Sequence, residues 1–151
     1  MFKEQETSIS YSLENAVRSH QEILQEFKLN TIFDYAKDLT KEETEKIKKY
    51  VQENIEKEIQ NYQVLKIKNQ IIGCFCIKSY EDGILLDEIY LLEPYRDKKI
   101  GSTLIKKILK ENKIVYLWVY KENVIALNLY KKLGFKIQEE TETRYFMRYK
   151  K

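Results

Sequence analysis

The segment from residue 95 to residue 102 reads Tyr-Arg-Asp-Lys-Lys-Ile-Gly-Ser and combines three cationic side chains with one glycine. An apolar pattern of helical spacing begins within it, at Ile100. Free backbone N–H groups at a helix N-terminus, reinforced by the helix dipole, attract anions, and Gly101 lets the backbone come close to such a ligand. The segment therefore predicts a phosphate-binding loop, although one glycine beside several lysines also occurs at ordinary helix starts.

The distribution of charge favours an anionic partner in the same region. The net charge is +3, but residues 1–69 carry 11 Lys and Arg against 13 Asp and Glu, whereas residues 70–151 carry 16 against 11. Seven basic and two acidic residues lie between Arg96 and Lys113. We expect an anion to dock there, unless the segment is only a solvated helix face. The modest total charge and the lack of a recognition motif argue against nucleic acid as the partner.

The histidine and cysteine content excludes several kinds of chemistry. Cys74 and Cys76 are the only cysteines and His20 is the only histidine, so the usual four-ligand zinc set is missing and no metal is expected. The same shortage argues against Ser-His-Asp and Cys-His nucleophilic schemes. We expect both cysteines to be buried in a strand and His20 to lie outside the functional site.

Apolar spacing predicts helices in the first half of the chain and mostly strands in the second. One helix is expected around Ala16 to Phe27, with a break near Asn30, and a capping box of Thr40 and Glu43 begins the next helix. A weak strand is placed at 7–11. The elements expected after residue 62 are strands at 64–67, 71–80 and 84–92, a helix from Ile100, a strand at 114–119, a helix at 123–133 ended by Gly134, and strands at 135–138 and 143–149.

The order of these elements places the phosphate-binding loop in the fold. The strand at 84–92, the helix from Ile100 and the strand at 114–119 form a crossover between parallel strands, and its loop lies at the carboxyl end of the first strand, where ligands bind. With 151 residues and 43% hydrophobic content, the chain is expected to be a single α/β domain over residues 1–151. It lacks an apolar run of about 20 residues and a signal-peptide core, so we expect a cytoplasmic protein without a membrane partner.

A second motif lies at residues 123–135, where Asn123, Ala126 and Tyr130 share one helical face. It resembles the Asn-x-x-Ala-x-x-Leu-Tyr-x-x-Leu-Gly-Phe signature of the GNAT N-acetyltransferase family, and the earlier loop resembles that family's Arg/Gln-x-x-Gly-x-Gly/Ala pyrophosphate loop. The resemblance covers about residues 62–149. It implies the GNAT fold, a mixed and mostly antiparallel sheet of six to seven strands flanked by about four helices, with a splayed strand pair that receives coenzyme A.

The resemblance also implies acetyl-CoA as the co-substrate. Residues 96–103 are expected to wrap the pyrophosphate, an N–H near Leu91 or Leu92 to polarise the acetyl carbonyl, and Asn123 to bind the pantetheine arm. The loop departs from the family pattern because Lys99 stands where its first glycine is usual. The residues expected to bind the cofactor are Leu91, Leu92, Arg96, Asp97, Lys98, Lys99, Ile100, Gly101, Ser102, Thr103, Asn123 and Tyr130.

Two residues are candidates for the proton transfers of acetyl transfer. The acceptor ammonium must lose a proton and the thiolate that leaves must gain one. The resemblance places Glu88 where many family members have a base and Tyr130 at the general-acid position. Asp87 is a rival base on the opposite strand face, and a purely structural acidic pair is a further alternative. For Tyr130 the alternative is simple core packing.

The chain is thus expected to be an acetyl-CoA-dependent N-acetyltransferase of the acyltransferase class, which moves the acetyl group directly onto a primary amine of a small molecule or peptide in a ternary complex. Two alternatives remain open: a degenerate GNAT fold that senses coenzyme A without transfer, and a nucleic-acid-binding domain. The acceptor is expected between the 30–40 connection and the last two strands, near aromatic side chains. A homodimer also remains open. The aromatic residues in question are Phe33, Tyr35, Tyr145 and Phe146.

Overall fold

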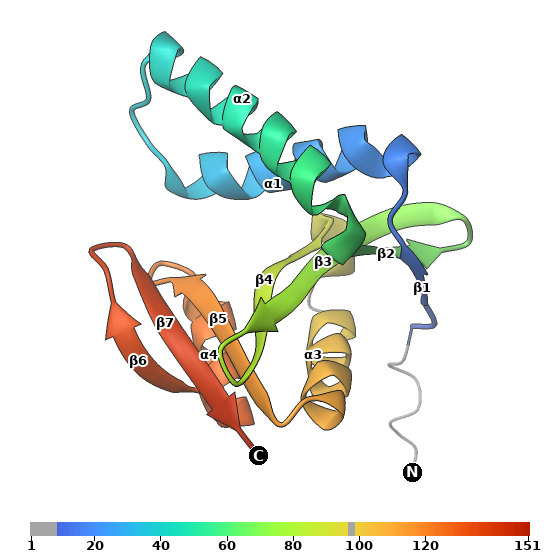
Figure 1. Cartoon of the computed structure of the whole chain (residues 1–151), viewed down its shortest axis with the longest axis vertical. Helices are drawn as coiled ribbons and strands as arrows, with labels where there is room; N and C mark the ends of the chain where they lie inside the picture. Colours follow the sequence, from blue (N-terminus) through green and yellow to red (C-terminus); the bar gives the residue numbers. More distant parts are fainter. Residues whose placement is uncertain (1–8, 97–98) are drawn as a thin grey trace. The chain divides into compact units, whose positions relative to one another are not determined.

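The computed structural model describes residues 9–96 and 99–151 and divides into two compact units. The helical unit comprises Tyr11–Cys76 and Glu88–Tyr90. The carboxyl-terminal unit comprises residues 9–10, Ile77–Asp87 and Leu91–Lys151. Seven strands form one sheet in the order β1-β2-β3-β4-β5-β7-β6 (Figure 1). Two of these strands, β3 (Gln70–Tyr80) and β4 (Gly83–Leu91), carry residues of both units.

In the helical unit, two long helices accompany antiparallel strands. The helices α1 and α2 run in opposite directions and pack on each other (Figure 1). Their inward residues Leu24, Phe27, Val51 and Ile55 are fully buried, as the apolar spacing of the sequence requires. β1 pairs with β2, and β2 with β3, both antiparallel. The elements of this unit are β1 (Ser12–Asn15), a 3-10 turn (Arg18–His20), α1 (Gln21–Tyr35), α2 (Lys41–Glu58), a second 3-10 turn (Ile59–Asn61) and β2 (Tyr62–Ile67).

The capping box at the start of α2 is confirmed. The Glu43 backbone N–H donates to the Thr40 hydroxyl at 3.1 Å, and the Thr40 N–H donates to the Glu43 carboxylate at 2.9 Å. Hydrogen bonding of the Glu43 carboxylate by the Thr40 backbone N–H, and secondarily by the Thr40 side chain, lowers the pKa of Glu43, because it favours the ionised form.

Two expectations for the first helix are wrong. The helix does not break near Asn30, because the Asn30 amide donates to the Tyr90 hydroxyl at 3.2 Å and so satisfies its polar group without leaving the helix. The helix also begins later than expected, since Ala16 still donates to the Tyr62 carbonyl as an extension of the strand ladder. The first described strand is Ser12–Asn15, whereas the weak strand at 7–11 was expected partly in residues that the structure does not describe.

The carboxyl-terminal unit contains the expected crossover. β4 and β5 are parallel and are joined through α3, while β7 pairs antiparallel with both β5 and β6. Gly134, with φ of 109°, ends α4 as predicted. The elements after β4 are a 3-10 turn (Glu93–Tyr95), α3 (Ile100–Glu111), β5 (Ile114–Tyr120), α4 (Val124–Leu133), β6 (Lys136–Glu140) and β7 (Arg144–Lys150).

The strand β6 carries a β-bulge. Ile137 pairs with Met147 and Glu139 pairs with Phe146, which leaves Gln138 as an extra residue between the two pairs. All five residues of β6 are exposed.

The pairing of β4 with β5 covers only one end of the two strands. It consists of three residue pairs and stops at Leu86 and Leu117, although the strands continue to Leu91 and Tyr120. At the paired end, a Cβ on Gly83 would lie 2.2 Å from the Ile114 carbonyl oxygen, so only glycine permits this approach. The two strands are therefore held close at one end and left unpaired at the other, as expected for a splayed pair.

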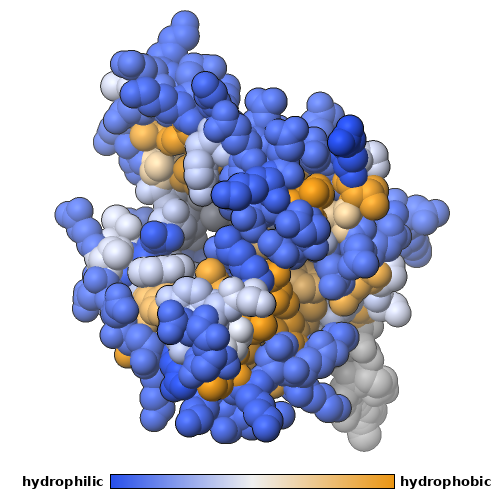
Figure 2. Space-filling view, viewed as in Figure 1, coloured by the Kyte–Doolittle hydropathy of each residue, from blue (hydrophilic) through white to orange (hydrophobic). Residues whose placement is uncertain are grey.

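The surface is largely hydrophilic. Apolar groups reach the face seen in Figure 2 only in limited areas among polar side chains. Within residues 9–96 and 99–151, no helix combines the length and the apolar character needed to cross a membrane.

Candidate cofactor and catalytic site

The segment after β4 folds back onto the end of that strand. The Arg96 Nε donates to the Leu91 carbonyl at 2.7 Å, and the backbone of Tyr95 donates to the Leu92 carbonyl at 2.9 Å. A further bond from the Arg96 N–H to the Glu93 carbonyl closes the 3-10 turn. These bonds fix a guanidinium group directly beside the unpaired end of β4.

The helix α3 begins at a left-handed residue. Lys99 has φ of 65° and ψ of 4° and serves as the N-cap, and the Thr103 N–H donates to its carbonyl at 3.0 Å. The N–H groups of Ile100, Gly101 and Ser102 precede this first helical bond, so they have no carbonyl partner within α3. The cradle of free N–H groups expected for a phosphate is therefore formed without the family's glycine, at the expense of backbone strain at Lys99. The predicted cofactor residues Asp97 and Lys98 lie outside the described residues.

Gly101 has free space around it. A Cβ added at this residue would meet only the Leu91 Cδ1, at 3.6 Å, which is an ordinary van der Waals contact. Unlike Gly134, Gly101 does not have a φ in the left-handed region. Neither packing nor backbone conformation thus requires glycine here, which fits a requirement imposed by a ligand.

Asn123 caps the helix α4. Its Oδ1 accepts a hydrogen bond from the Ala126 N–H at 3.2 Å, which is the ordinary role of an N-cap asparagine. The side-chain amide group makes no hydrogen bond with the described residues. Asn123 can therefore cap the helix and at the same time donate to a ligand.

Tyr130 lies one and a half to two turns further along α4 and is only 6% exposed. Its ring packs against Phe135, with 5.4 Å between the ring centroids, so core packing is part of its role. Burial raises the pKa of Tyr130 to about 12. Among the described residues, none forms a hydrogen bond with its hydroxyl. The phenol is thus a neutral donor that no protein group engages.

Glu88 lies within the helical unit and is held by several donors. Its Oε1 accepts from the Tyr62 hydroxyl and from Lys28 Nζ, the latter at 3.3 Å, and Cys74 Sγ lies 3.8 Å from its Oε2. The side chain is 8% exposed. The rival base Asp87 pairs with Lys78 at 3.6 Å and is 26% exposed. The two carboxylates therefore have different lysine partners and different exposure.

The structure brings together only some of the predicted residues. Arg96 donates to the Leu91 carbonyl, and a Cβ added at Gly101, at the start of α3, would also meet the Leu91 side chain, while Asn123 and Tyr130 both belong to α4 and its cap. The described contacts of Glu88 all lie within the helical unit. Phe146, expected near the acceptor, is 6% exposed and stacks on Tyr116, with 5.5 Å between the ring centroids. Its place near the acceptor stays a prediction.

The sequence analysis did not single out Lys28 or Tyr62. They lie 60 and 26 residues from Glu88 in the chain, and no local motif marks either one. His20, expected outside the site, accepts a hydrogen bond from the Val17 N–H in the first 3-10 turn. Cys74 and Cys76 are fully buried in β3, as predicted.

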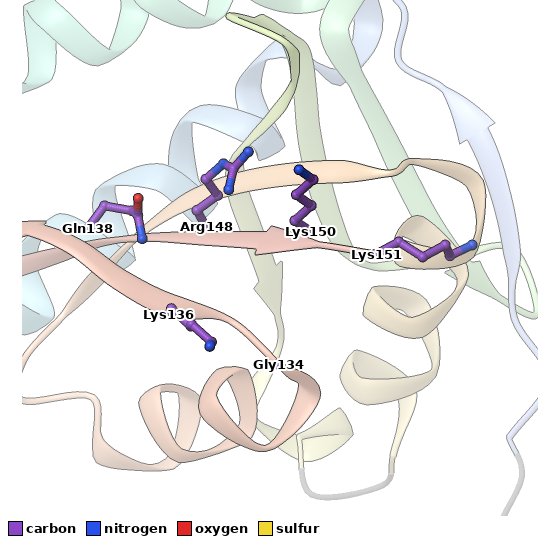
Figure 3. A pocket seen from close by; sticks show the side chains of 6 residues that line it. All are labelled: Gly134, Lys136, Gln138, Arg148, Lys150 and Lys151. Atoms are coloured by element: carbon purple, nitrogen blue, oxygen red, sulfur yellow. The ribbon is translucent and has the colours of Figure 1, made fainter.

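A separate basic pocket of about 280 Å³ lies on the carboxyl-terminal unit. Arg148 and Lys150 extend from the same side of β7 (Figure 3). The lining includes four cationic side chains and no carboxylate, so positive charge extends beyond the predicted patch of residues 96–113. The lining residues are Gly134, Lys136, Gln138, Arg148, Lys150 and Lys151.

The start of α3, predicted to bind phosphate, and the capped helix α4 both lie in a region that matches a known family. Residues 21–135 match the model of the acetyltransferase (GNAT) family. The chain belongs to the GNAT family. Its fold is also that of the PaiA N-acetyltransferase from Thermoplasma acidophilum in complex with coenzyme A, with a TM-score of 0.76 and 24% identity over 95% of this chain and all of that one. An N-acetyltransferase from Staphylococcus aureus Mu50 has a TM-score of 0.70 and 16% identity, over 91% of this chain and 98% of that one.

Two curated proteins are similar in sequence to this GNAT chain. A spermidine N(1)-acetyltransferase from Thermoplasma acidophilum is 32% identical over an alignment of 82 residues. The match covers 51% of this chain and 51% of the other. An uncharacterised N-acetyltransferase from Chlorobaculum tepidum is 32% identical over 100 residues, covering 62% of this chain and 59% of the other. The match thus spans about half the length of these curated relatives.

Replacement of Lys99 separates backbone strain from charge. Lys99→Ala and Lys99→Gly both remove the ammonium group, but only glycine adopts the left-handed conformation without a Cβ penalty. We expect the glycine variant to be more stable than the alanine variant by about 1 kcal/mol in urea denaturation. Equal stability of the two variants would show that Lys99 is not strained. A coenzyme A dissociation constant raised to the same extent in both would measure the contribution of the ammonium group.

Proposed function

We propose that this GNAT chain is an N-acetyltransferase that binds acetyl-CoA and transfers its acetyl group to a primary amine. The observation that carries the proposal is the presence of three features that suit this substrate. They are the unpaired ends of β4 and β5, the phosphate-binding start of α3 and the α4 residues Asn123 and Tyr130. The unpaired ends fit the pantetheine arm, and the start of α3 fits the pyrophosphate.

The residues of the carboxyl-terminal unit fit the chemical groups of acetyl-CoA. The N–H groups of Ile100, Gly101 and Ser102, with Arg96 at 2.7 Å from the Leu91 carbonyl, supply donors and charge for the pyrophosphate. The amide group of Asn123 is a donor for a pantetheine carbonyl. We further propose that a backbone N–H at Leu91 or Leu92 holds the oxyanion of the tetrahedral intermediate.

In the proposed mechanism the acceptor nitrogen attacks the thioester carbon directly. A C–N bond forms, the C–S bond breaks, and the acetyl carbonyl regenerates as the oxyanion collapses. The acceptor ammonium loses one proton to Glu88, directly or through water, which frees the lone pair for attack. The nitrogen loses a second proton as the tetrahedral intermediate collapses, and the sulfur gains one before coenzyme A leaves. Asp87 is the less favoured base because its side chain is the more exposed of the two carboxylates.

Tyr130 would act on the sulfur mainly as a hydrogen-bond donor. Burial raises its pKa to about 12, well above the value of about 8.5 typical of a thiol, so full proton transfer to a free thiolate is unfavourable. A donated hydrogen bond can still stabilise negative charge as it develops on sulfur. The proton that finally reaches coenzyme A then derives from solvent or from the acceptor nitrogen.

The relative named spermidine N(1)-acetyltransferase makes aliphatic polyamines the first acceptors to examine for this chain. Acetyl-CoA should be incubated with the chain and with polyamines, aminoglycosides, amino acids or short peptides, while thiol release is followed. We expect release above the amine-free rate with at least one acceptor class. Coenzyme A binding without turnover on any amine would instead favour a sensor, which is the second candidate because Lys99 departs from the family loop. Failure to bind coenzyme A even at millimolar concentration would refute both.

A methyl group at residue 101 should affect the ligand rather than the fold. Gly101→Ala is expected to leave stability unchanged or raise it by up to about 1 kcal/mol, because alanine favours a helix and the site has room. The dissociation constant of coenzyme A should rise about tenfold or more, which corresponds to a loss of about 1.4 kcal/mol. Equilibrium binding and thermal unfolding measure the two effects.

Gly134→Ala is the matched control for this variant. Because residue 134 has a left-handed backbone, the Gly134→Ala variant should be less stable than the unmodified chain. Its affinity for coenzyme A should be retained. Unchanged affinity in Gly101→Ala would refute the assignment of this loop to the pyrophosphate.

Removal of the Tyr130 hydroxyl should affect the chemical step. Tyr130→Phe keeps the ring that packs on Phe135, so folding and coenzyme A binding should be retained. We expect kcat to fall about 100-fold, the lower end of typical effects of removing one hydrogen-bond donor from developing negative charge. Because the pKa of Tyr130 is about 12, kcat of the unmodified chain should show no loss from phenol ionisation up to about pH 11. A kcat unchanged by the substitution would reduce Tyr130 to a packing residue.

A further inference from the structure

The carboxylate of Glu88 is surrounded by donors from three elements of the helical unit. Lys28 comes from α1, Tyr62 from β2 and Cys74 from β3, and these are the titratable groups that contact Glu88 within the described helical unit. Their exposed fractions are 14% for the Lys28 side chain, 1% for Tyr62 and 0% for Cys74. A carboxylate so deeply buried is stable only when it is paired and hydrogen-bonded.

The three donors differ in charge. Burial, followed by the nearby Glu88 carboxylate, raises the pKa of Tyr62 well above its ordinary value, and the same two causes raise the pKa of the Cys74 thiol. Both groups therefore remain neutral donors. The ammonium group of Lys28 is the only positive charge in direct contact with Glu88 within the described helical unit.

The two oxygens of Glu88 are used unequally. Oε1 accepts from both Tyr62 and Lys28, whereas Oε2 has only the weak thiol contact with Cys74 at 3.8 Å. A carboxylate oxygen has two lone-pair sites, so Oε2 keeps the capacity to receive a proton. The network fixes one oxygen and leaves the other available.

The helix α1 holds the neighbouring part of β4 as well. Phe27 stacks on the Tyr90 ring, with 4.7 Å between the centroids and 23° between the planes, and Asn30 donates to the Tyr90 hydroxyl. Three residues within one turn of α1 therefore fix positions 88 and 90 of β4. The next residue along the strand is Leu91, one of the two residues whose N–H is proposed to hold the oxyanion.

We infer that Lys28 and Tyr62 are positioning residues that hold Glu88 as an ionised carboxylate, with Oε2 directed to receive the proton of the acceptor amine. This inference rests on the proposed function, because it assigns a role to the surroundings of the proposed base. In the step, one N–H bond of the acceptor breaks and one O–H bond forms at Oε2, directly or through a water molecule. The proton then passes to solvent, which restores the carboxylate beside Lys28.

The dependence of transfer on pH tests this role. Without the Lys28 ammonium, the buried carboxylate should take up a proton at a higher pH than in the unmodified chain. We expect the acidic limb of the kcat profile to move upward by about one pH unit in Lys28→Met. Tyr62→Phe should move it in the same direction by less, whereas Lys28→Arg, which retains the charge, should restore it. The KM for acetyl-CoA should change little in all three.

Two lysine pairs elsewhere provide matched controls. Lys78→Met removes the partner of Asp87, and Lys66→Met removes the partner of Glu14, a pair in the same unit. Both variants should keep the acidic limb of the unmodified chain. A shift in Lys78→Met but not in Lys28→Met would identify Asp87 as the base and overturn the inference.

A purely structural network gives a different result. In that case Lys28→Met and Tyr62→Phe lower the melting temperature but leave the acidic limb in place. If Lys28→Met does not fold, the Tyr62→Phe variant decides. An acidic limb of kcat at the same pH as in the unmodified chain overturns the inference, and a limb at higher pH supports it. An unmodified chain that binds acetyl-CoA but acetylates no amine refutes the proposed function first, and the inference with it, before any variant is compared.

Discussion

The limited pairing of β4 with β5 is the constraint on which the rest of the site depends. Three residue pairs join these parallel strands, and the close approach of Gly83 to the Ile114 carbonyl holds them together at that end. Beyond Leu86 the backbone groups of β4 that face β5 have no ladder to join. Partly buried backbone N–H and C=O groups find partners in protein, water or a ligand, so this unpaired strand end can accept the hydrogen bonds of a bound molecule.

The loop that follows the unpaired end of β4 combines backbone strain with positive charge at one residue. The loop after β4 needs a sharp change of direction before α3, and Lys99 provides it in a conformation that glycine adopts more easily. Two nearby hydrogen bonds offset this strain by holding the chain in place. Arg96 donates to the Leu91 carbonyl, and the Thr103 N–H donates to the Lys99 carbonyl. The strained residue also carries a positive charge at the start of α3, where the pyrophosphate is proposed to bind, so strain and charge are combined in one residue.

Sequence alone predicted those parts of the molecule that depend on local patterns. The capping box of Thr40 and Glu43, the crossover through α3 and the end of α4 at Gly134 are all encoded by residues within a few positions of one another. The GNAT motif of residues 123–135 is likewise local. The positive φ of Lys99 is not encoded by its residue type, because lysine usually adopts a negative φ.

Features that depend on distant partners were not predictable in this way. Asn30 looks like a helix breaker until Tyr90, 60 residues away, satisfies its side chain. Lys28 and Glu88 are also 60 residues apart, so their pairing cannot be read from a local motif. The sequence of an amphipathic helix does not indicate which of its lysines is mostly covered, as the Lys28 side chain is. The stacking of Phe146 on Tyr116 is hidden in the sequence for a similar reason, because it depends on the register between β5 and β7.

The bulge in β6 has a consequence for how copies of the chain can meet. β6 is the last strand of the sheet, and Gln138 interrupts its regular ladder between Lys136 and Glu139. A bulge and charged side chains on an edge strand oppose its pairing with a strand of another molecule, which protects against aggregation. The opposite border is the four-residue strand β1, too short to recruit much of a neighbour. Self-association through a continuous intermolecular sheet is therefore disfavoured at both borders.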